Sequence, residues 1–305
     1  MTPPAAPRSI LAATDLTPAC RPVLRAAGEL ALRSGGELHV VHAFDFPPSP
    51  YLEDTERPDS FLGRIADAER ALRVQVLEAV PAGVRLGELR VEIYAAHRAV
   101  AYWAAAVEAD VVVIGPHVRR DLELPFLGGT ADRLLRTLEA PCLVVRGPLR
   151  LPLRRVLVPM DASEWARAAL QVGLAWAGSL GDEAEGPVSV DVLHVAPREL
   201  AGGDAPFARA EVLPGWNRGL EEAVAESGAA ARVRVREEVR FGDAPADGIV
   251  SAAEETRADL LVMATHGYGA VRRALLGGTA QAVARRAPCP VLLVPPRLWR
   301  DAPDS

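Results

Sequence analysis

The sequence predicts an α/β protein made of two tandem copies of a doubly wound domain, each with a five-stranded parallel sheet. The chain has 305 residues, about twice the length of an ordinary domain. Four sequence blocks recur in the same order in both halves. Within each half, short apolar segments alternate with segments of helical periodicity, a pattern typical of a parallel sheet covered by helices on both faces.

The repeated blocks are separated by 146 to 149 residues, so the two halves are colinear. They are ILAATD (10–15) with VLVPMD (156–161), ADVVVIG (109–115) with ADLLVMA (258–264), LGGTA at 127–131 and 276–280, and APC at 140–142 and 287–289. Four matched blocks in one order indicate a duplicated domain. We place the domains at residues 1–147 and 153–297, and we expect the segment between them, RGPLRLPLRR (146–155), to be a solvated connector.

Strands are expected where short apolar runs occur. In the first copy they are 10–13, 38–43, 89–94, 111–114 and 143–145. The run at 111–114 is continuously apolar, as expected when both faces of a sheet are covered. In the second copy, 231–237 alternates Arg with Ala and Val and predicts a half-buried strand. His42 and His194 each lie at the end of an apolar strand, and we expect both to be structural.

Helices are expected between these strands. In the first copy, Thr17 is a candidate N-cap with Pro18 at the first helical position. Further helices are expected at 59–80, around 100–107 and near 130–139. In the second copy, Ser163 is a candidate N-cap. The helices expected there span 164–178, 216–227, 245–256 and 279–286.

Composition excludes several functions. The net charge of −6 and the pI of about 5.6 argue against a general binder of nucleic acid or anionic membrane. No apolar run approaches the ~20 residues that span a bilayer, and the first residues lack an apolar leader region, so we expect a cytoplasmic protein. All 34 basic residues are arginine, which excludes a P-loop lysine and a lysine Schiff base. Cys20, Cys142 and Cys289 form neither a disulfide framework nor a zinc pattern.

Several of these motifs together resemble universal stress protein domains. They are the Pro-x-Asp step that ends the first strand of the second copy (159–161), the pair His194-Val195, and the series MATHG, LGGTA and APCPVLLV. The resemblance covers nearly the whole chain, and the second copy is the closer one. It implies an adenine nucleotide alpha hydrolase-like, Rossmann-like fold with strand order 3-2-1-4-5. Many such domains bind ATP through Gly-x2-Gly-x9-Gly followed by Ser or Thr, whereas others lack the pattern and do not bind it.

In the second copy, the resemblance places Asp161 beside the adenine and ribose, and it places the backbone of Val195 against the adenine. The nucleotide-binding residues that it implies there are Pro159, Asp161, Val195, Met263, Ala264, His266, Gly267, Gly277, Gly278 and Thr279. Alanine stands at the first glycine position and Gly278 at the hydroxyl position, with Thr279 directly behind it. Glycines let backbone N–H groups approach phosphate closely, and a helix that starts at Thr279 would direct its free N–H groups at the same phosphates.

In the first copy, the corresponding positions are weaker candidates. They are Asp15, Ala43, Gly115, Gly128, Gly129 and Thr130. Val118 replaces the second glycine, and a β-branched residue resists positive φ. The loop 118–127 has no net charge, whereas the matching loop 267–276 carries two arginines and no acid. We therefore expect the nucleotide site in the second copy and a degenerate site in the first.

Simpler interpretations remain open at three of these positions. Asp161 could merely turn the chain before the helix that Ser163 caps. His266 could be a solvated polar group in a loop. The glycines of the GGT segments could serve only to cap and turn the chain.

Three classes of function fit the sequence. We favour an ATP-binding stress-response or signalling protein that uses ATP or another adenine nucleotide, with Mg²⁺ as an optional companion. The alternatives are an interaction scaffold that binds no nucleotide and, as the least favoured, a slow ATPase. No catalytic or metal-ligating residue is assigned, because 264–279 holds no carboxylate and the chain holds no lysine. An enzyme is not expected.

The last strands of the two copies, Leu143–Val145 and Val291–Val294, are short and apolar, and bare edges of this kind invite aggregation. The resemblance implies that they pair antiparallel in an intramolecular pseudo-dimer around a two-fold axis. That pairing would keep Cys142 and Cys289 too far apart to form a disulfide. A homodimer of the whole chain is compatible with the sequence, but nothing in it demands one. Neither nucleic acid nor membrane is expected as a partner.

Overall fold

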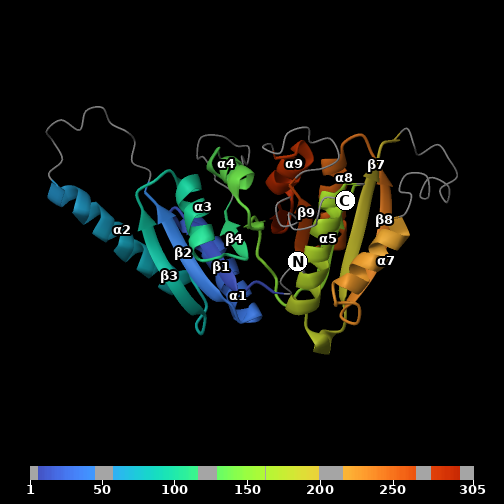
Figure 1. Ribbon diagram of the computed structural model, residues 1–305, viewed down its shortest axis with the longest axis horizontal. Helices are drawn as coiled ribbons and strands as arrows, with labels where there is room; N and C mark the ends of the chain where they lie inside the picture. The colour runs from blue at the N-terminus through green and yellow to red at the C-terminus, as the bar shows by residue number, and fades with distance from the viewer. Residues whose placement is uncertain are drawn as a thin grey trace, which may run out of the picture.

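The computed structural model describes residues 6–44, 58–115, 129–161, 163–198, 216–265 and 276–295 (Figure 1). The strands are β1 Ser9–Thr14, β2 Glu37–Ala43, β3 Arg85–Glu92, β4 Val111–Ile114, β5 Cys142–Val144, β6 Arg155–Pro159, β7 Val188–Ala196, β8 Val233–Phe241, β9 Leu260–Ala264 and β10 Val291–Val294. The α-helices are α1 Arg21–Ser34, α2 Pro58–Ala79, α3 Ala96–Ala106, α4 Gly129–Thr137, α5 Glu164–Leu180, α7 Trp216–Glu226, α8 Pro245–Thr256 and α9 Gly278–Arg286. Each strand and helix expected from the sequence is present within a few residues.

The strands form one ten-stranded sheet in the order β3-β2-β1-β4-β5-β10-β9-β6-β7-β8. Within each half the pairings are parallel, and each half has the order 3-2-1-4-5. The two halves join where β5 and β10 pair antiparallel. The expected doubly wound domains and their pairing through the last strands are therefore confirmed.

Leu143 faces Leu292 at the centre of this junction, flanked by the pairs Val144–Val291 and Cys142–Leu293. Because the two leucines hold the same position in their sheets, a pseudo-two-fold axis passes between them. The register also corrects the alignment of the APC blocks. The N–H groups of Val112 and Leu261 donate to the carbonyls of Pro141 and Pro290, respectively, so these two prolines correspond and the two cysteines do not. Cys142 and Cys289 are both free.

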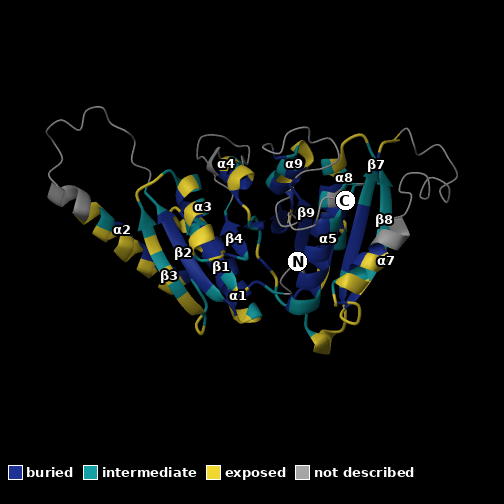
Figure 2. Ribbon diagram, viewed as in Figure 1, coloured by how far each residue is buried: buried dark blue, intermediate teal, exposed yellow. Residues whose placement is uncertain are grey.

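Helices cover both faces of the sheet. One buried cluster joins α1, α2, α5 and α7 to alternate strand residues such as Ile10 and Val158. The other joins α3, α4, α8 and α9 to the strand residues that point to the opposite face of the sheet, such as Leu11 and Leu157. The central strands are buried on both faces, while the outer strands β3 and β8 carry exposed positions (Figure 2). This alternation explains why the central strands have continuous apolar sequences.

One expectation from the sequence is wrong, and a second is confirmed only in part. The connector at 146–155 is not simply solvated, since Leu149 and Leu153 are 5% and 1% exposed and pack into the cluster that contains α1 and α5. Thr17 is an N-cap followed by Pro18, as expected, but the helix that it precedes is a short 3-10 turn and its side chain makes no capping hydrogen bond. Pro18–Cys20 form a 3-10 turn before α1, and the Thr17 hydroxyl instead donates to Asp15. In the connector, burial of leucine side chains outweighs the preference of a Pro- and Arg-rich segment for solvent. At Thr17, the hydrogen bond to Asp15 replaces the capping hydrogen bond.

Candidate functional site

The candidate site of the second half lies where the strand order reverses, between β6 and β9. Their parallel pairing covers Val156–Leu260 and Leu157–Leu261 and ends there, before either strand ends. The ends of the two strands beyond that pairing are Pro159 and the pair Met263–Ala264. Ligands of doubly wound sheets bind in the crevice outside the carboxyl ends at such a reversal, so the topology places these candidate residues beside it.

On its other side, β6 stays attached to β7. The Met160 N–H donates to the Leu193 carbonyl over 2.8 Å, and Nδ1 of His194 lies 2.8 Å from the Met160 carbonyl oxygen. In the first half, Nδ1 of His42 lies 2.9 Å from the Thr14 carbonyl oxygen. Both histidines therefore hold the end of the first strand of their domain, which agrees with the structural role expected for them.

Asp161 follows this anchored strand end and turns the chain into α5. Its Oδ1 accepts from the Ser163 N–H at 3.0 Å and from the Ser163 hydroxyl. Ser163 then caps the helix, because its Oγ accepts from the Ala166 N–H at 3.2 Å. In the other half, Oδ1 of Asp15 accepts in the same way from both the N–H and the hydroxyl of Thr17. Asp161 therefore turns the chain before α5, and this role is compatible with a ligand contact.

The start of α9 completes the second-half site. Its N-cap is Gly277, whose N–H donates to the Thr265 carbonyl at 2.8 Å and so holds the helix start against the end of β9. No side chain of the described residues caps this end, and no acidic residue lies in its first turn. Gly278 and Thr279 are exposed, and a Cβ on Gly278 would meet no atom within 4 Å. Within the described part of the chain, the Gly278 position at the start of α9 is therefore open.

Val195 lies near the end of β7, where its side chain packs against Gly248 of α8. A Cβ on Gly248 would come within 3.1 Å of that side chain. The side chains of Met263 and Ala264 are buried in opposite clusters, and Pro159 is buried as well. His266 and Gly267 lie outside the described residues, so their predicted contacts stay predictions.

The first-half candidates are arranged in the same way, with two differences. Ala43 ends β2, Gly115 follows β4, and Gly129 and Thr130 begin α4, while Gly128 and Val118 lie outside the described residues. A Cβ on Gly115 would come within 2.9 Å of the Val23 side chain, so packing alone requires glycine there. The first turn of α4 also contains Asp132, and this negative charge opposes anion binding at a helix N-terminus.

The sequence analysis did not single out Asp132, although a signal was available. Aligning LGGTAD with LGGTAQ places Asp132 opposite Gln281, which gives the first helix an acid where the second has a neutral amide. Near Asp15, burial raises the pKa of Cys20 to about 11, so this thiol is a poor nucleophile at neutral pH. Among the described residues, no group of three or more His, Cys, Asp or Glu side chains could hold a metal ion.

Comparison with known proteins agrees with this architecture. The model of the universal stress protein family matches residues 7–146 and again 152–295. A universal stress protein of Thermus aquaticus is 34% identical over 141 residues, which are 46% of this chain and 98% of that protein. The crystal structure of a universal stress protein from Archaeoglobus fulgidus covers 94% of this chain and is itself covered to 96%, with 19% identity and a TM-score of 0.65.

A further solved structure matches one half of the chain only. It is a universal stress protein in complex with cAMP, with 25% identity over 47% of this chain and 97% of its own and a TM-score of 0.37. Within the part of this chain that the structure describes, no helix is long and apolar enough to cross a membrane. Because the family model matches both halves over nearly their whole length, the chain belongs to the universal stress protein family, as a tandem of two such domains.

Proposed function

We propose that this chain is an ATP-binding stress-response or signalling protein of the cytoplasm, that its adenine nucleotide is bound mainly by the second half, and that it is not an enzyme. The observation that carries the proposal is the start of α9 beside the reversal of strand order, where no described side chain caps the helix and Gly278 leaves room. Backbone N–H groups at a helix N-terminus bind phosphate oxygens, and the helix dipole favours their negative charge. Gly277 and Gly278 allow close approach of a polyphosphate to this end.

The remaining candidates fit the nucleoside part of such a ligand. Asp161 and Val195 lie at the carboxyl ends of β6 and β7, on the same edge of the sheet as the start of α9. In this arrangement the Asp161 carboxylate accepts hydrogen bonds from ribose hydroxyls, while the Val195 backbone faces the adenine. The residues therefore suit an adenine nucleotide, with the sugar near β6 and the phosphates at α9.

The two halves are proposed to differ in affinity. Asp132 in the first turn of α4 repels phosphate, whereas Gln281 holds that position in α9 without charge. The sequence contrast between the loops at 118–127 and 267–276 points the same way, although both loops fall almost wholly outside the described residues. Binding without efficient hydrolysis is proposed because 264–279 holds no carboxylate and the chain holds no lysine.

The test places a negative charge at one helix start at a time. Gly278→Asp is tolerated by the fold, because the position is open and an acid stabilises the first turn of a helix. We expect it to weaken binding of a non-hydrolysable ATP analogue at least tenfold in titration calorimetry without lowering the melting temperature. The matched variant Gly129→Asp at the start of α4 should bind like the wild type.

If wild type and Gly278→Asp bind the ATP analogue with equal affinity, the phosphates do not bind at the start of α9. If the purified wild type releases no adenine nucleotide on denaturation and also binds no analogue in titration, the chain is the alternative interaction scaffold. Steady release of phosphate from ATP by the wild type, lost in Gly278→Asp, would instead favour the slow ATPase.

A further inference from the structure

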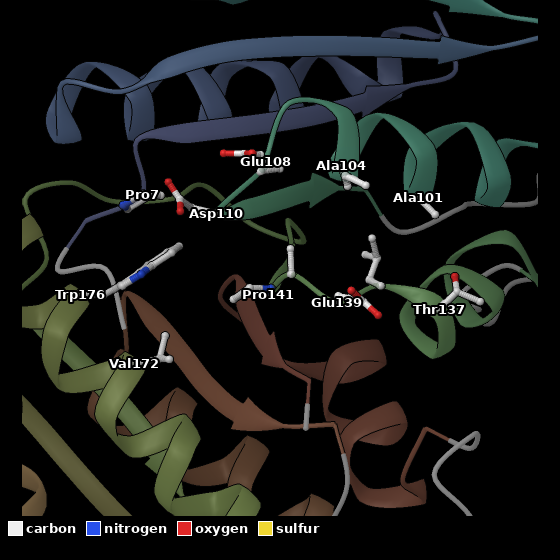
Figure 3. Close-up of a pocket in the computed structure, with 14 residues that line it drawn as sticks. Pro7, Ala101, Ala104, Glu108, Asp110, Thr137, Glu139, Pro141, Val172 and Trp176 are labelled. Carbon is white, nitrogen blue, oxygen red and sulfur yellow. The ribbon is translucent and has the colours of Figure 1, made fainter. Parts of the chain in front are cut away.

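A cavity of about 420 Å³ lies between the two halves, away from the candidate nucleotide sites (Figure 3). On one side it is lined by Asp110 and Pro141, which directly precede β4 and β5, so it opens at the amino edge of the first half. Val172 and Trp176 of α5 line it from the second half. Its volume lies in the range of sites that hold small ligands or peptide side chains.

The pseudo-two-fold axis relates this cavity to a place in the second half that the chain itself covers. There the connector runs along the amino edge of the sheet. A Cβ on Gly147 would come within 3.0 Å of the Pro288 carbonyl oxygen, and Arg150 lies close enough to Cys289 to affect the pKa of its thiol. Leu149 and Leu153 of the connector are buried. One connector covers one of two equivalent places, and among the described residues none fills the other.

The open place is the more acidic of the two. Glu108, Asp110 and Glu139 line it. The positions related to them by the axis are Arg257, Asp259 and Pro288. Glu108 and Arg257 share an unusual positive φ, of 48° and 51°, which supports their equivalence. The helices α3 and α4 also end at this cavity, and helix C-termini carry a partial negative charge.

Apolar side chains supply the rest of the lining. Trp176 and Val172 lie on one side of the cavity, and Ala101 and Ala104 lie on the other (Figure 3). Alanines 105 and 109 also line it. An occupant must therefore combine aliphatic groups with positive charge. The connector that covers the equivalent place has this chemistry, since residues 147–152 are Gly-Pro-Leu-Arg-Leu-Pro.

We propose that the cavity is a docking site for an extended, basic and aliphatic peptide segment of a partner protein, with the leucine, arginine and proline chemistry of the connector. Its leucines occupy the wall formed by Trp176 and the alanines, and its arginine lies towards Glu108 and Glu139. This site is at the amino edge of the first half and does not require that the chain bind a nucleotide.

The experiment uses the full chain and a blocked synthetic peptide of sequence GPLRLP, with binding measured by titration calorimetry at low salt. We expect saturable binding, and at least tenfold weaker binding of GPLELP because its glutamate faces the acidic wall. Ala105→Phe fills the cavity from an exposed lining position and should weaken binding at least tenfold. The equivalent exposed position in the second half gives the matched control, Glu254→Phe, which should bind like the wild type.

Charge is tested separately from shape. Glu108→Gln should weaken binding about threefold or more, and Glu69→Gln on the exposed face of α2 should not change it. Equal affinity of wild type and Ala105→Phe would overturn the proposal, as would absence of peptide binding. If binding appears only in a chain shortened to end at Pro295, the chain's own last residues compete for the cavity, and docking of a partner segment is overturned.

Discussion

Asp132 and Gln281 hold the same position in the two repeats and contact each other across the junction. Nε2 of Gln281 donates to Oδ1 of Asp132 over 3.4 Å, with the first turns of α4 and α9 side by side (Figure 1). Asp132 also pairs with Arg136 one turn later at 2.8 Å. A pseudo-symmetric contact between unlike residues means that the two candidate phosphate-binding ends are neighbours and that only one of them carries an acid.

Gln281→Glu should destabilise the chain, because it places a second carboxylate against Asp132. We expect a loss of about 0.5 kcal/mol in unfolding free energy, reduced by added salt. Urea denaturation of the single variants and of the double variant Asp132→Asn with Gln281→Glu measures this coupling. Additive effects in that cycle would show that the two side chains do not interact.

Leu143→Ala should weaken the junction between the halves. Leu143 faces Leu292, and both side chains are fully buried, so truncation should cost about 2–5 kcal/mol. Leu32→Ala is the control, since Leu32 is 52% exposed. Equal denaturation midpoints for the two variants would contradict the pairing of β5 with β10.

Asp161→Asn separates the two roles of this residue. An asparagine Oδ1 still accepts from Ser163, so we expect stability within about 0.5 kcal/mol of the wild type. Asp161→Ala removes both hydrogen bonds and should cost about 1–2 kcal/mol. If the carboxylate also contacts ribose, both variants should bind the ATP analogue about tenfold more weakly. Unchanged affinity of Asp161→Asn would leave Asp161 with the turn as its role.

Stability should fall in alkaline solution because of the buried thiols. Burial raises the pKa of Cys142 well above the ordinary value of a cysteine thiol, about 9, and that of Cys289 to about 12. The folded chain thus holds these protons more tightly than the unfolded chain. The buried thiols therefore cost no stability below pH 9, and the free energy of unfolding falls as the pH rises above 9. For Cys142 the loss at pH 10 is about 1.4 kcal/mol.

Because the chain has no lysine, no lysine side chain titrates together with the thiols at alkaline pH. Urea denaturation at pH 8 and pH 10 measures the effect, and Cys142→Ala should show a smaller decrease between the two pH values than the wild type. The same decrease in both proteins would mean that Cys142 is not the source.

Much of the candidate site could be predicted because its residues follow strand ends, which local patterns locate. Asp161 after β6, Val195 in β7 and the glycines before α9 all lie at one edge, as parallel strands require. The contact of Asp132 with Gln281 and the cavity beside Trp176 could not be predicted this way. Their neighbours come from the other half of the chain, and no local periodicity records such a contact.

The sequence by itself determined the repeated doubly wound domains, because strand and helix periodicity are local properties of a chain. Only the tertiary structure decided that Pro141 corresponds to Pro290, that Leu149 and Leu153 are buried, and that a cavity lies at the amino edge of the first half. These features depend on side chains about 150 residues apart packing against each other. The connector covers one of two equivalent surfaces, and none of the described residues covers the other, so the described part of the chain is less symmetric than its repeats.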